Sequence, residues 1–177
     1  MKKDQFFSEN LISWYKKNKR NLPWRKNVND ENYPYKVMVS EFMLQQTGVS
    51  TVIPYFENFI NRWPTIVSLA SAREEDILLA WQGLGYYRRA RNLLKSAKQI
   101  CNQYDSKVPT SLEELQSLPG VGVYASGAIR SIAFDKKAVA VDGNVKRVLA
   151  RYYGFSGRLD QNEKIINEQA IKCCPDK

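Results

Sequence analysis

Apolar residues recur three and four positions apart along most of the chain, which is the spacing of one face of an α-helix. The clearest run extends from Tyr35 to Gln46 behind Pro34 and is apolar on nearly every side, as expected for a buried helix. Only residues 138–141 look like a strand, and that segment is short. The pattern predicts an all-α protein. Further helices are marked by Phe7, Leu11, Trp14 and Tyr15, by a segment running to Trp63, by residues leading to Gly83, by Leu93, Ala97, Ile100, Cys101 and Tyr104, and by residues 163–172.

Polar residues mark where two of these helices begin. Ser71 with Glu74, and Ser111 with Glu114, have the spacing of a capping box. The helix after Ser111 is short, because the Pro-Gly pair at residues 119–120 cannot continue it. Each serine is therefore a predicted helix start.

The Gly-Val-Gly turn at residues 120–122 joins that short helix to a second helical run, residues 124–134. Gly120 and Gly122 permit backbone conformations that other residues resist. The turn ends at a helix N-terminus, where free N–H groups and the helix dipole form a sequence-independent phosphate site. An ordinary turn between two helices has the same signature, so the turn alone leaves both interpretations open.

Asp142 is the first of two carboxylates that are candidates for chemistry. It stands where a helix N-cap is expected, and capping alone could explain it. The helix that it would cap is marked by Val145, Val148, Leu149 and Tyr152 and stops at Gly154.

Glu41 is the second carboxylate and lies in the middle of the buried run. Its neighbours three and four positions away are Val37, Met38, Leu44 and Gln45, none of them a cation. Burial under these conditions raises the pKa of a carboxyl and keeps it protonated, which a general acid requires. The alternative is an ion pair with an arginine from elsewhere in the chain.

The composition narrows the chemistry further. The 177-residue sequence has no histidine, so Ser-His and Cys-His mechanisms and histidine metal ligands are excluded. Its three cysteines, two of them adjacent, lack zinc-like spacing and favour free thiols in a reducing compartment. A P-loop sequence is also missing. Carboxylates must therefore perform any acid–base step, and no metal site is expected.

The charge of the chain favours a polyanionic partner. The formal net charge is +9. The sequence has no bilayer-spanning apolar stretch and no signal peptide, so we expect a cytoplasmic protein without membrane contact. Much of the positive charge lies in two groups of Lys and Arg residues. Each group could be a solvated face, but both adjoin glycine-containing loops, which favours contact with DNA phosphates. These groups are Arg88, Arg89, Arg91, Lys95 and Lys98, and Lys136, Lys137, Lys146, Arg147 and Arg151.

Several segments together resemble a known family. Residues 118–129 are similar to the helix–hairpin–helix signature of the endonuclease III superfamily of base-excision DNA glycosylases, and residues 140–145, Ala-Val-Asp-Gly-Asn-Val, to its catalytic loop. Residues 22–25, 39–47 and 81–87 closely resemble the adenine glycosylase branch, the MutY type. The similarity covers nearly the whole chain, in order.

The resemblance implies a helix–hairpin–helix DNA glycosylase fold. Residues 26–140 would form a six-helix barrel with the hairpin at 111–134. Residues 1–25 would be an N-terminal helix and lead-in, and residues 141–177 the catalytic Asp loop, the next helix and a truncated return to a second domain. The family's four-cysteine loop for a [4Fe-4S] cluster, and its domain that reads 8-oxoguanine, would lie beyond Lys177, so no cofactor is expected within this chain.

The implied activity is hydrolysis of the N-glycosidic bond of adenine mispaired with 8-oxoguanine or guanine in duplex DNA. This bond breaks through an oxocarbenium-like sugar, which needs a proton donor at the base and an anion near the sugar. By similarity Glu41 protonates adenine N7 and Asp142 stabilises C1′, with Tyr124 and Asn144 in the same catalytic set. The base must first be flipped out of the duplex. The implied DNA contacts are Trp24 and Arg25 in the adenine pocket, Gln46, Tyr86 and Leu84 at the vacated stack and opposite base, and Leu44, Thr47, Leu118, Gly120, Val121 and Gly122.

Tyr124 separates two branches of the family. Bifunctional members carry a lysine nucleophile two residues after the Gly-Val-Gly turn, and this chain has Tyr124 there. A phenol cannot form a Schiff base, so we expect a monofunctional glycosylase that uses water.

Two alternatives remain open, an endonuclease III-like glycosylase of other base specificity and a truncated, non-catalytic helix–hairpin–helix module that binds DNA. The expected state is a monomer. Association through an exposed apolar face of the first helix, which carries Phe6, Leu11 and Trp14, is the alternative to it.

Overall fold

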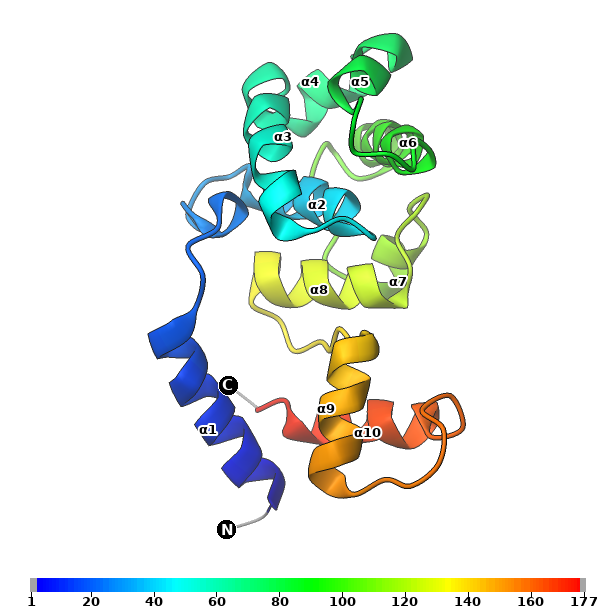
Figure 1. The fold of residues 1–177 in the computed structure, drawn as a ribbon. Helices are drawn as coiled ribbons and strands as arrows, with labels where there is room; N and C mark the ends of the chain where they lie inside the picture. The colour runs from blue at the N-terminus through cyan, green and yellow to red at the C-terminus, as the bar shows by residue number, and fades with distance from the viewer. Residues whose placement is uncertain (1–2, 176–177) are drawn as a thin grey trace.

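The computed structural model describes residues 3–175, and this part of the chain contains ten α-helices and no strand (Figure 1). The predicted all-α fold is confirmed. None of the helices in the described range combines the length and apolarity needed to cross a bilayer. The helices are α1 Lys3–Asn18, α2 Tyr33–Leu44, α3 Val49–Arg62, α4 Ile66–Ala70, α5 Glu74–Ala80, α6 Arg88–Gln103, α7 Leu112–Gln116, α8 Val123–Phe134, α9 Gly143–Tyr153 and α10 Glu163–Cys173, with a short 3₁₀ helix, η1, at Pro23–Arg25.

Helix α2 lies at the centre of the larger apolar core. Pro34 occupies its first turn, and nine of its residues are buried, Val37 to Met43 among them. Figure 1 shows α3 to α6 on one side of α2 and α7 and α8 on the other. Because α2 is enclosed by other helices, any group in its middle is removed from water.

A smaller apolar core joins α1, α9 and α10. Leu149, Ile166 and Ala170 are its buried residues, and Phe7 packs against it. A polar network also ties α1 to this core: the hydroxyl of Tyr153 and the amide of Gln169 each donate to a carboxylate oxygen of Asp4, at 2.7 Å. The remaining face of α1 is open to solvent, with Phe6, Leu11 and Trp14 exposed by 50%, 51% and 61%.

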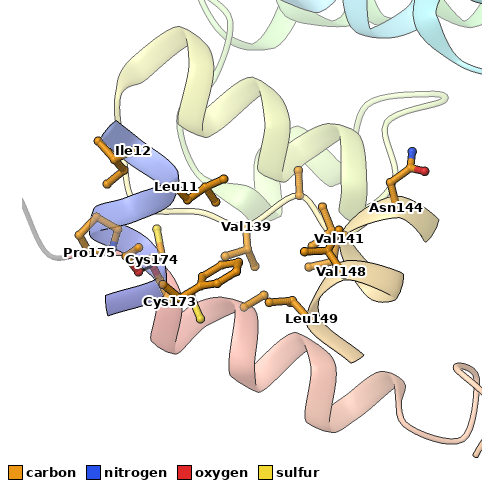
Figure 2. Close-up of a pocket in the computed structure, with 15 residues that line it drawn as sticks. Leu11, Ile12, Val139, Val141, Asn144, Val148, Leu149, Cys173, Cys174 and Pro175 are labelled. Carbon is orange, nitrogen blue, oxygen red and sulfur yellow. Dashed lines mark hydrogen bonds between the residues drawn. The ribbon is translucent and has the colours of Figure 1, made fainter. Parts of the chain in front are cut away.

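A wide apolar groove lies between α1, α9 and the end of α10. It has a volume of about 470 Å³ and is lined by Leu11 and Ile12 of α1, Val141, Val148 of α9 and Cys174 (Figure 2). Val148, one of the residues whose spacing marked α9, borders the groove and is 51% exposed.

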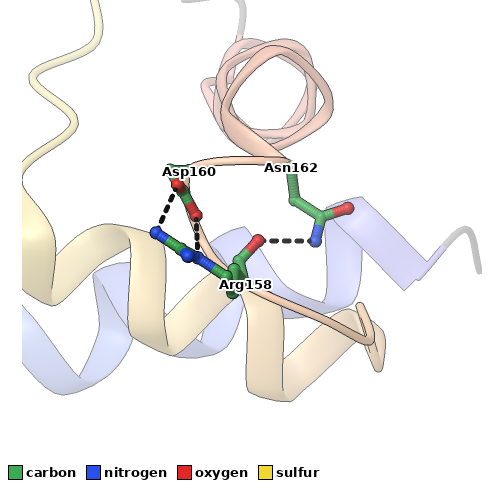
Figure 3. Close-up of polar contacts among 3 residues, drawn as sticks. All are labelled: Arg158, Asp160 and Asn162. Atoms are coloured by element: carbon green, nitrogen blue, oxygen red, sulfur yellow. Dashed lines mark hydrogen bonds and ion pairs between the residues drawn. The ribbon is translucent and has the colours of Figure 1, made fainter.

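The connection from α9 to α10 is fixed by its own polar side chains. Gly154 ends α9 in the left-handed conformation, as predicted. Arg158 makes a two-pronged contact with Asp160, at 3.1 and 3.0 Å, and the amide of Asn162 donates to the Arg158 carbonyl at 3.0 Å (Figure 3). These contacts turn the chain at the surface, where α10 begins.

Two local predictions were wrong. Residues 138–141 form no strand, and the backbone carbonyl of Val139 lies against Gly127 of α8. Ser71 caps no helix start. It is the C-cap of α4, its hydroxyl donates to the Val67 carbonyl, and α5 begins only at Glu74. The Ser111 cap is confirmed, since its hydroxyl accepts from the Glu114 amide at 3.1 Å.

Candidate active site and nucleic-acid interface

The Gly-Val-Gly turn joins α7 to α8. Gly120 has a φ of +83°, and a Cβ there would lie 2.9 Å from atoms of Phe42 and Asn92, so this position requires glycine. Gly122 does not, because its φ of −90° and ψ of −175° are ordinary extended values. Gly122 is the N-cap of α8 and is exposed, so the free N–H groups of that helix end face solvent.

Buried side chains and two hydrogen bonds hold the Gly-Val-Gly turn in place. The side chains of Leu118 and Val121 are 2% and 4% exposed and belong to the larger core. The Ser96 hydroxyl donates to the Pro119 carbonyl at 2.9 Å, and the Gln45 amide donates to the Gly120 carbonyl at 3.3 Å. The buried side chains leave the backbone of the turn as its outward-facing surface, which is the geometry of a phosphate site.

Glu41 is buried in the centre of α2, as predicted, with 8% of its surface exposed. Burial raises the pKa of its carboxyl to about 7, against the smaller opposing effect of the charge on Arg25. The alternative interpretation of Glu41 was an ion pair with a distant arginine. Arg25 does act on the Glu41 carboxyl, but its charge does not cancel the effect of burial on the pKa. The Glu41 carboxyl holds a proton up to neutral pH.

Asp142 is the N-cap of α9, and one of its two carboxylate oxygens makes the capping hydrogen bond. Oδ1 accepts from the Val145 backbone N–H at 2.8 Å. Oδ2 accepts from the side-chain amide of Asn144 at 2.9 Å, and the oxygen of that amide accepts in turn from Arg147. Asn144 is thus held with its N–H side toward Asp142. Both carboxylate oxygens are oriented by the chain before any ligand binds.

Tyr124 connects the two carboxyl groups electrostatically. Burial raises the pKa of its phenol, the charges of Glu41 and Asp142 raise it further, and Arg25 lowers it. The phenol therefore stays protonated at neutral pH and lies within electrostatic range of both carboxyl groups. Helices α2, α8 and the start of α9 bring together the four residues that the sequence analysis grouped only by similarity.

Arg25, whose charge acts on Glu41 and Tyr124, borders a cleft that neither of these two residues lines. The cleft has a volume of about 540 Å³ and is lined by Leu22, Tyr33 and Ile132, among others. Arg25 is the last residue of the 3₁₀ helix η1 and donates to the Tyr15 hydroxyl at 3.1 Å. Trp24, which the resemblance also placed at the adenine pocket, is 3% exposed and packs edge-on against Phe56 at 5.3 Å, so its contact with a base stays a prediction.

A second group of predicted DNA contacts surrounds the end of α2 and the loop after α5. Gln46 and Tyr86 are both exposed and both have left-handed backbones, with φ of 59° and 49°. Leu84 is only 5% exposed and belongs to the larger core, so it lies beneath this surface and its contact with the opposite base stays a prediction. Leu44 and Thr47 lie on either side of Gln46 in the sequence and are half-buried.

Arg89 was missed as a structural residue, because the sequence analysis counted it with the surface charge. Its side chain is 7% exposed and donates to backbone carbonyls at the end of α2 and in the loop after α5. The spacing could have revealed this, since Arg89 precedes Leu93, Ala97 and Ile100 on the inward face of α6. Arg91, from the same basic group, forms a surface ion pair with Glu74 at 2.9 Å.

The described residues do not fit an iron–sulfur cluster. Within residues 3–175 no group of three or more His, Cys, Asp or Glu side chains could hold a metal ion. Cys101, Cys173 and Cys174 are free thiols. The cluster implied by the resemblance stays a prediction.

Comparison with known proteins identifies the family of the chain. Residues 39–175 match the family model described as HhH-GPD superfamily base excision DNA repair protein. The chain is 46% identical over 158 residues to the adenine DNA glycosylase of Buchnera aphidicola subsp. Schizaphis graminum, covering 89% of this chain and 44% of that protein. It is 44% identical over 168 residues to the adenine DNA glycosylase of Homo sapiens, covering 92% of this chain and 30% of that protein. It therefore spans less than half the length of these curated relatives.

Solved structures share the fold. A thermostable thymine-DNA glycosylase superposes with a TM-score of 0.86 at 28% identity, covering 98% of this chain and 79% of that one. A non-covalent endonuclease III–DNA complex superposes with a TM-score of 0.79, covering 99% of this chain and 79% of that one; at 23% identity it supports the fold alone.

Proposed function

Because the chain belongs to the HhH-GPD superfamily of base excision DNA repair proteins, we propose that it is the catalytic portion of an adenine DNA glycosylase. Its substrate would be adenine mispaired with 8-oxoguanine or guanine in duplex DNA. The observation that carries the proposal is a buried carboxyl, Glu41, whose pKa is raised to about 7, within electrostatic range of the same tyrosine as Asp142.

The proposed reaction assigns one task to each carboxyl group. With adenine flipped out of the duplex and placed against Glu41, the Glu41 carboxyl donates its proton to N7, which makes the base a better leaving group. The C1′–N9 bond then breaks and its electron pair leaves with adenine. The sugar carries the positive charge, and Asp142, oriented by Val145 and Asn144, stabilises it. Water adds to C1′ and loses a proton, which leaves an abasic site.

Tyr124 supports the monofunctional part of the proposal. A lyase step requires an amine that attacks C1′ and forms a Schiff base. The phenol of Tyr124 occupies the corresponding position and keeps its proton, since the pKa is raised from an already high ordinary value. The proposed product is therefore an intact strand with an abasic site, which breaks only on treatment with alkali.

The backbone turn at residues 120–122 and the exposed pair Gln46 and Tyr86 complete the proposed interface. The turn would hold a phosphate without reading sequence, since backbone N–H groups recognise every phosphate alike. Tyr86 presents an aromatic ring that is 63% exposed, and Gln46 an amide side chain; both could fill the space that a flipped base leaves.

A single-turnover assay tests the proposal. The chain in excess is incubated with duplexes that contain adenine opposite 8-oxoguanine, adenine opposite thymine, or thymine opposite guanine, and the products are treated with alkali. We expect cleavage at adenine opposite 8-oxoguanine and little at the other two. Release of thymine instead would support a different base specificity, and duplex binding without any release would support a non-catalytic module.

A further inference from the structure

Arg89 joins two separate segments through one buried guanidinium. Nη1 donates to the carbonyls of Met43, at 2.8 Å, and Gln45, at the C-terminal end of α2. Nη2 donates to the carbonyls of Leu84 and Gly85, each at 3.1 Å, in the loop after α5. A cation at the end of α2 also interacts favourably with the helix dipole. Two of these carbonyls have a second donor, since the Trp81 indole donates to Gly85 at 3.2 Å and the Thr47 hydroxyl to Gln45 at 3.4 Å. Arg89 is the group that contacts both segments.

The two contacted segments share a feature. Gln46 and Tyr86, the residues that follow the bound carbonyls of Gln45 and Gly85, are both left-handed. This conformation is unfavourable for residues with a Cβ and persists only where the surroundings impose it. The carbonyl of each preceding residue belongs to the peptide plane whose rotation sets φ of the next one. A guanidinium that fixes Gln45 and Gly85 therefore fixes the backbones of Gln46 and Tyr86.

The ring of Tyr86 is also held from the same group. The guanidinium carbon of Arg89 lies 5.4 Å from the centre of the Tyr86 ring and 5.6 Å from that of Trp81. Both distances are within the range of cation–π attraction. The side chain of Tyr86 is nevertheless 63% exposed, so Arg89 restrains the ring without covering it.

We propose that Arg89 is a positioning residue that sets the separation and backbone conformation of Gln46 and Tyr86, and so couples the end of α2 to the loop after α5. The proposal rests on the proposed function in one respect, namely that Gln46 and Tyr86 enter the duplex. Lysine cannot replace Arg89, because a single ammonium lacks the planar fork that reaches carbonyls on two segments.

Native-state hydrogen exchange of the free protein tests the clamp without DNA. The reporters are the Thr47 amide, bonded to Leu44 at 3.3 Å, and the Leu84 amide, bonded to Trp81 at 3.0 Å. Arg89→Lys should speed exchange at both by about tenfold, because charge-assisted hydrogen bonds that close local openings are lost. The amide of Val121 in the hairpin serves as the internal reference and should change little.

A matched control uses the second arginine that donates inward. Arg130 donates to the Thr110 carbonyl at 2.7 Å and is half-buried, away from both reporter segments. Arg130→Lys should leave exchange at Thr47 and Leu84 unchanged. If Arg89→Lys accelerates Val121 as much as the two reporters, or accelerates none of them, Arg89 is not a clamp.

A second variant covers the case in which Arg89→Lys does not fold. Gly85 has a φ of +70° with open space where a Cβ would be, so Gly85→Ala strains the backbone of its own loop and nothing else. If Arg89 couples the two segments, this strain weakens its grip and exchange at Thr47, on the other segment, also rises. Faster exchange confined to Leu84 would overturn the coupling.

Base flipping supplies the functional readout. A duplex with 2-aminopurine beside the adenine mispair brightens when the neighbouring base leaves the stack. Arg89→Lys should lose this increase to the same extent as Tyr86→Ala, while affinity for the duplex changes less than about threefold, because the phosphate contacts of the hairpin survive. An unchanged increase would overturn the positioning role. If the unaltered chain releases no adenine, the proposed function fails, whereas the exchange experiment still decides whether the clamp exists.

Discussion

At the scale of single residues, Glu41 carries the largest consequence, because the fold keeps a proton on a carboxyl that would lose it in water. Glu41→Gln keeps the shape and removes the acid. We expect the single-turnover rate of adenine release to fall by about 10²–10⁴-fold, the usual contribution of general acid catalysis. Duplex affinity should stay within a few-fold of the unaltered chain, measured by fluorescence anisotropy. Excision near the original rate would rule out Glu41 as the acid.

The raised pKa of Glu41 also predicts a pH dependence of both activity and stability. Release should fall as pH rises through about 7, since the protonated form is the donor. Between the ordinary value of 4.5 and about 7, the native carboxyl is protonated while the unfolded one is not, so stability falls as pH rises.

Glu41→Gln should remove this loss of stability. By linkage, a pKa that differs by about 2.5 between folded and unfolded states corresponds to about 3 kcal/mol. Relative to the unaltered chain, the variant should therefore gain on the order of 3 kcal/mol between pH 4 and pH 8, measured by denaturant unfolding. An equal pH dependence of the two proteins would show that Glu41 is not the titrating group.

Tyr124 offers a test of the monofunctional mechanism. Tyr124→Lys places an amine where bifunctional relatives carry their nucleophile, so a covalent adduct with DNA should become trappable with borohydride. The unaltered chain should give little adduct. Tyr124→Phe, which removes the hydroxyl without adding an amine, is the control and should trap no better than the parent. Strong trapping by the parent would mean that another lysine attacks C1′.

The residues that the sequence revealed and those that it concealed differ in the range of their contacts. Ser111, Gly154 and the Asp142 cap could be predicted, because each depends on neighbours within one helical turn. The burial of Glu41 followed from the periodicity of α2. The spacing of α6 indicates that Arg89 faces inward, but no local pattern encodes its bonds to the carbonyls of Met43 and Gln45, which lie 46 and 44 residues away.

At the scale of elements, the packing of α8 against residues 138–141 sets the position of the catalytic loop. A Cβ on Gly127 would lie 2.1 Å from the Val139 carbonyl oxygen, and that backbone cannot rotate away as a side chain could. The alternation of valine and alanine predicted a strand here, because an apolar extended segment has the same sequence pattern whether a strand or a helix receives it.

Two glycine variants on α8 separate the hairpin from the catalytic loop. Gly127→Ala must displace Val139 and with it Asp142, so we expect adenine release to fall by at least about tenfold with little change in duplex affinity. Gly122→Ala meets no protein atom and has an ordinary φ, so it should fold normally. Its added methyl group faces the proposed phosphate, and it should weaken duplex affinity instead.

Both outcomes are read from one pair of measurements, a binding titration and a single-turnover rate. The same loss pattern in the two variants would show that the hairpin and the loop do not act separately. Circular dichroism at matched temperature verifies that each variant is folded.

At the scale of the whole molecule, the net charge of +9 predicts salt-dependent binding to DNA. Affinity for a duplex should fall by about tenfold or more between about 50 and 200 mM salt, as counterions are released from each contacted phosphate. Lys95 is exposed and lies three residues from Asn92 on the same side of α6, and Asn92 packs against Gly120 in the hairpin turn. Lys95→Gln should therefore lower the slope of log affinity against log salt by about one.

Lys164 provides the matched control. It is also exposed, but it lies on α10, the helix that packs in the smaller core. Lys164→Gln should leave the slope unchanged. Equal effects of the two substitutions would mean that the charge acts as a diffuse field rather than through contacts near the hairpin.

The shared support of the hairpin and the catalytic loop has a further consequence. Gly122 is the N-cap of α8, and Gly127 within the same helix packs against Val139, three residues before Asp142. One helix therefore fixes the distance from the phosphate site to the carboxylate. Under the proposed function, the length of this helix determines which distance between a phosphate and a sugar in the substrate fits the site. An RNA–DNA hybrid, whose A-like geometry alters that distance, would bind out of register. The fold would thus reject such hybrids by their dimensions, without reading any base.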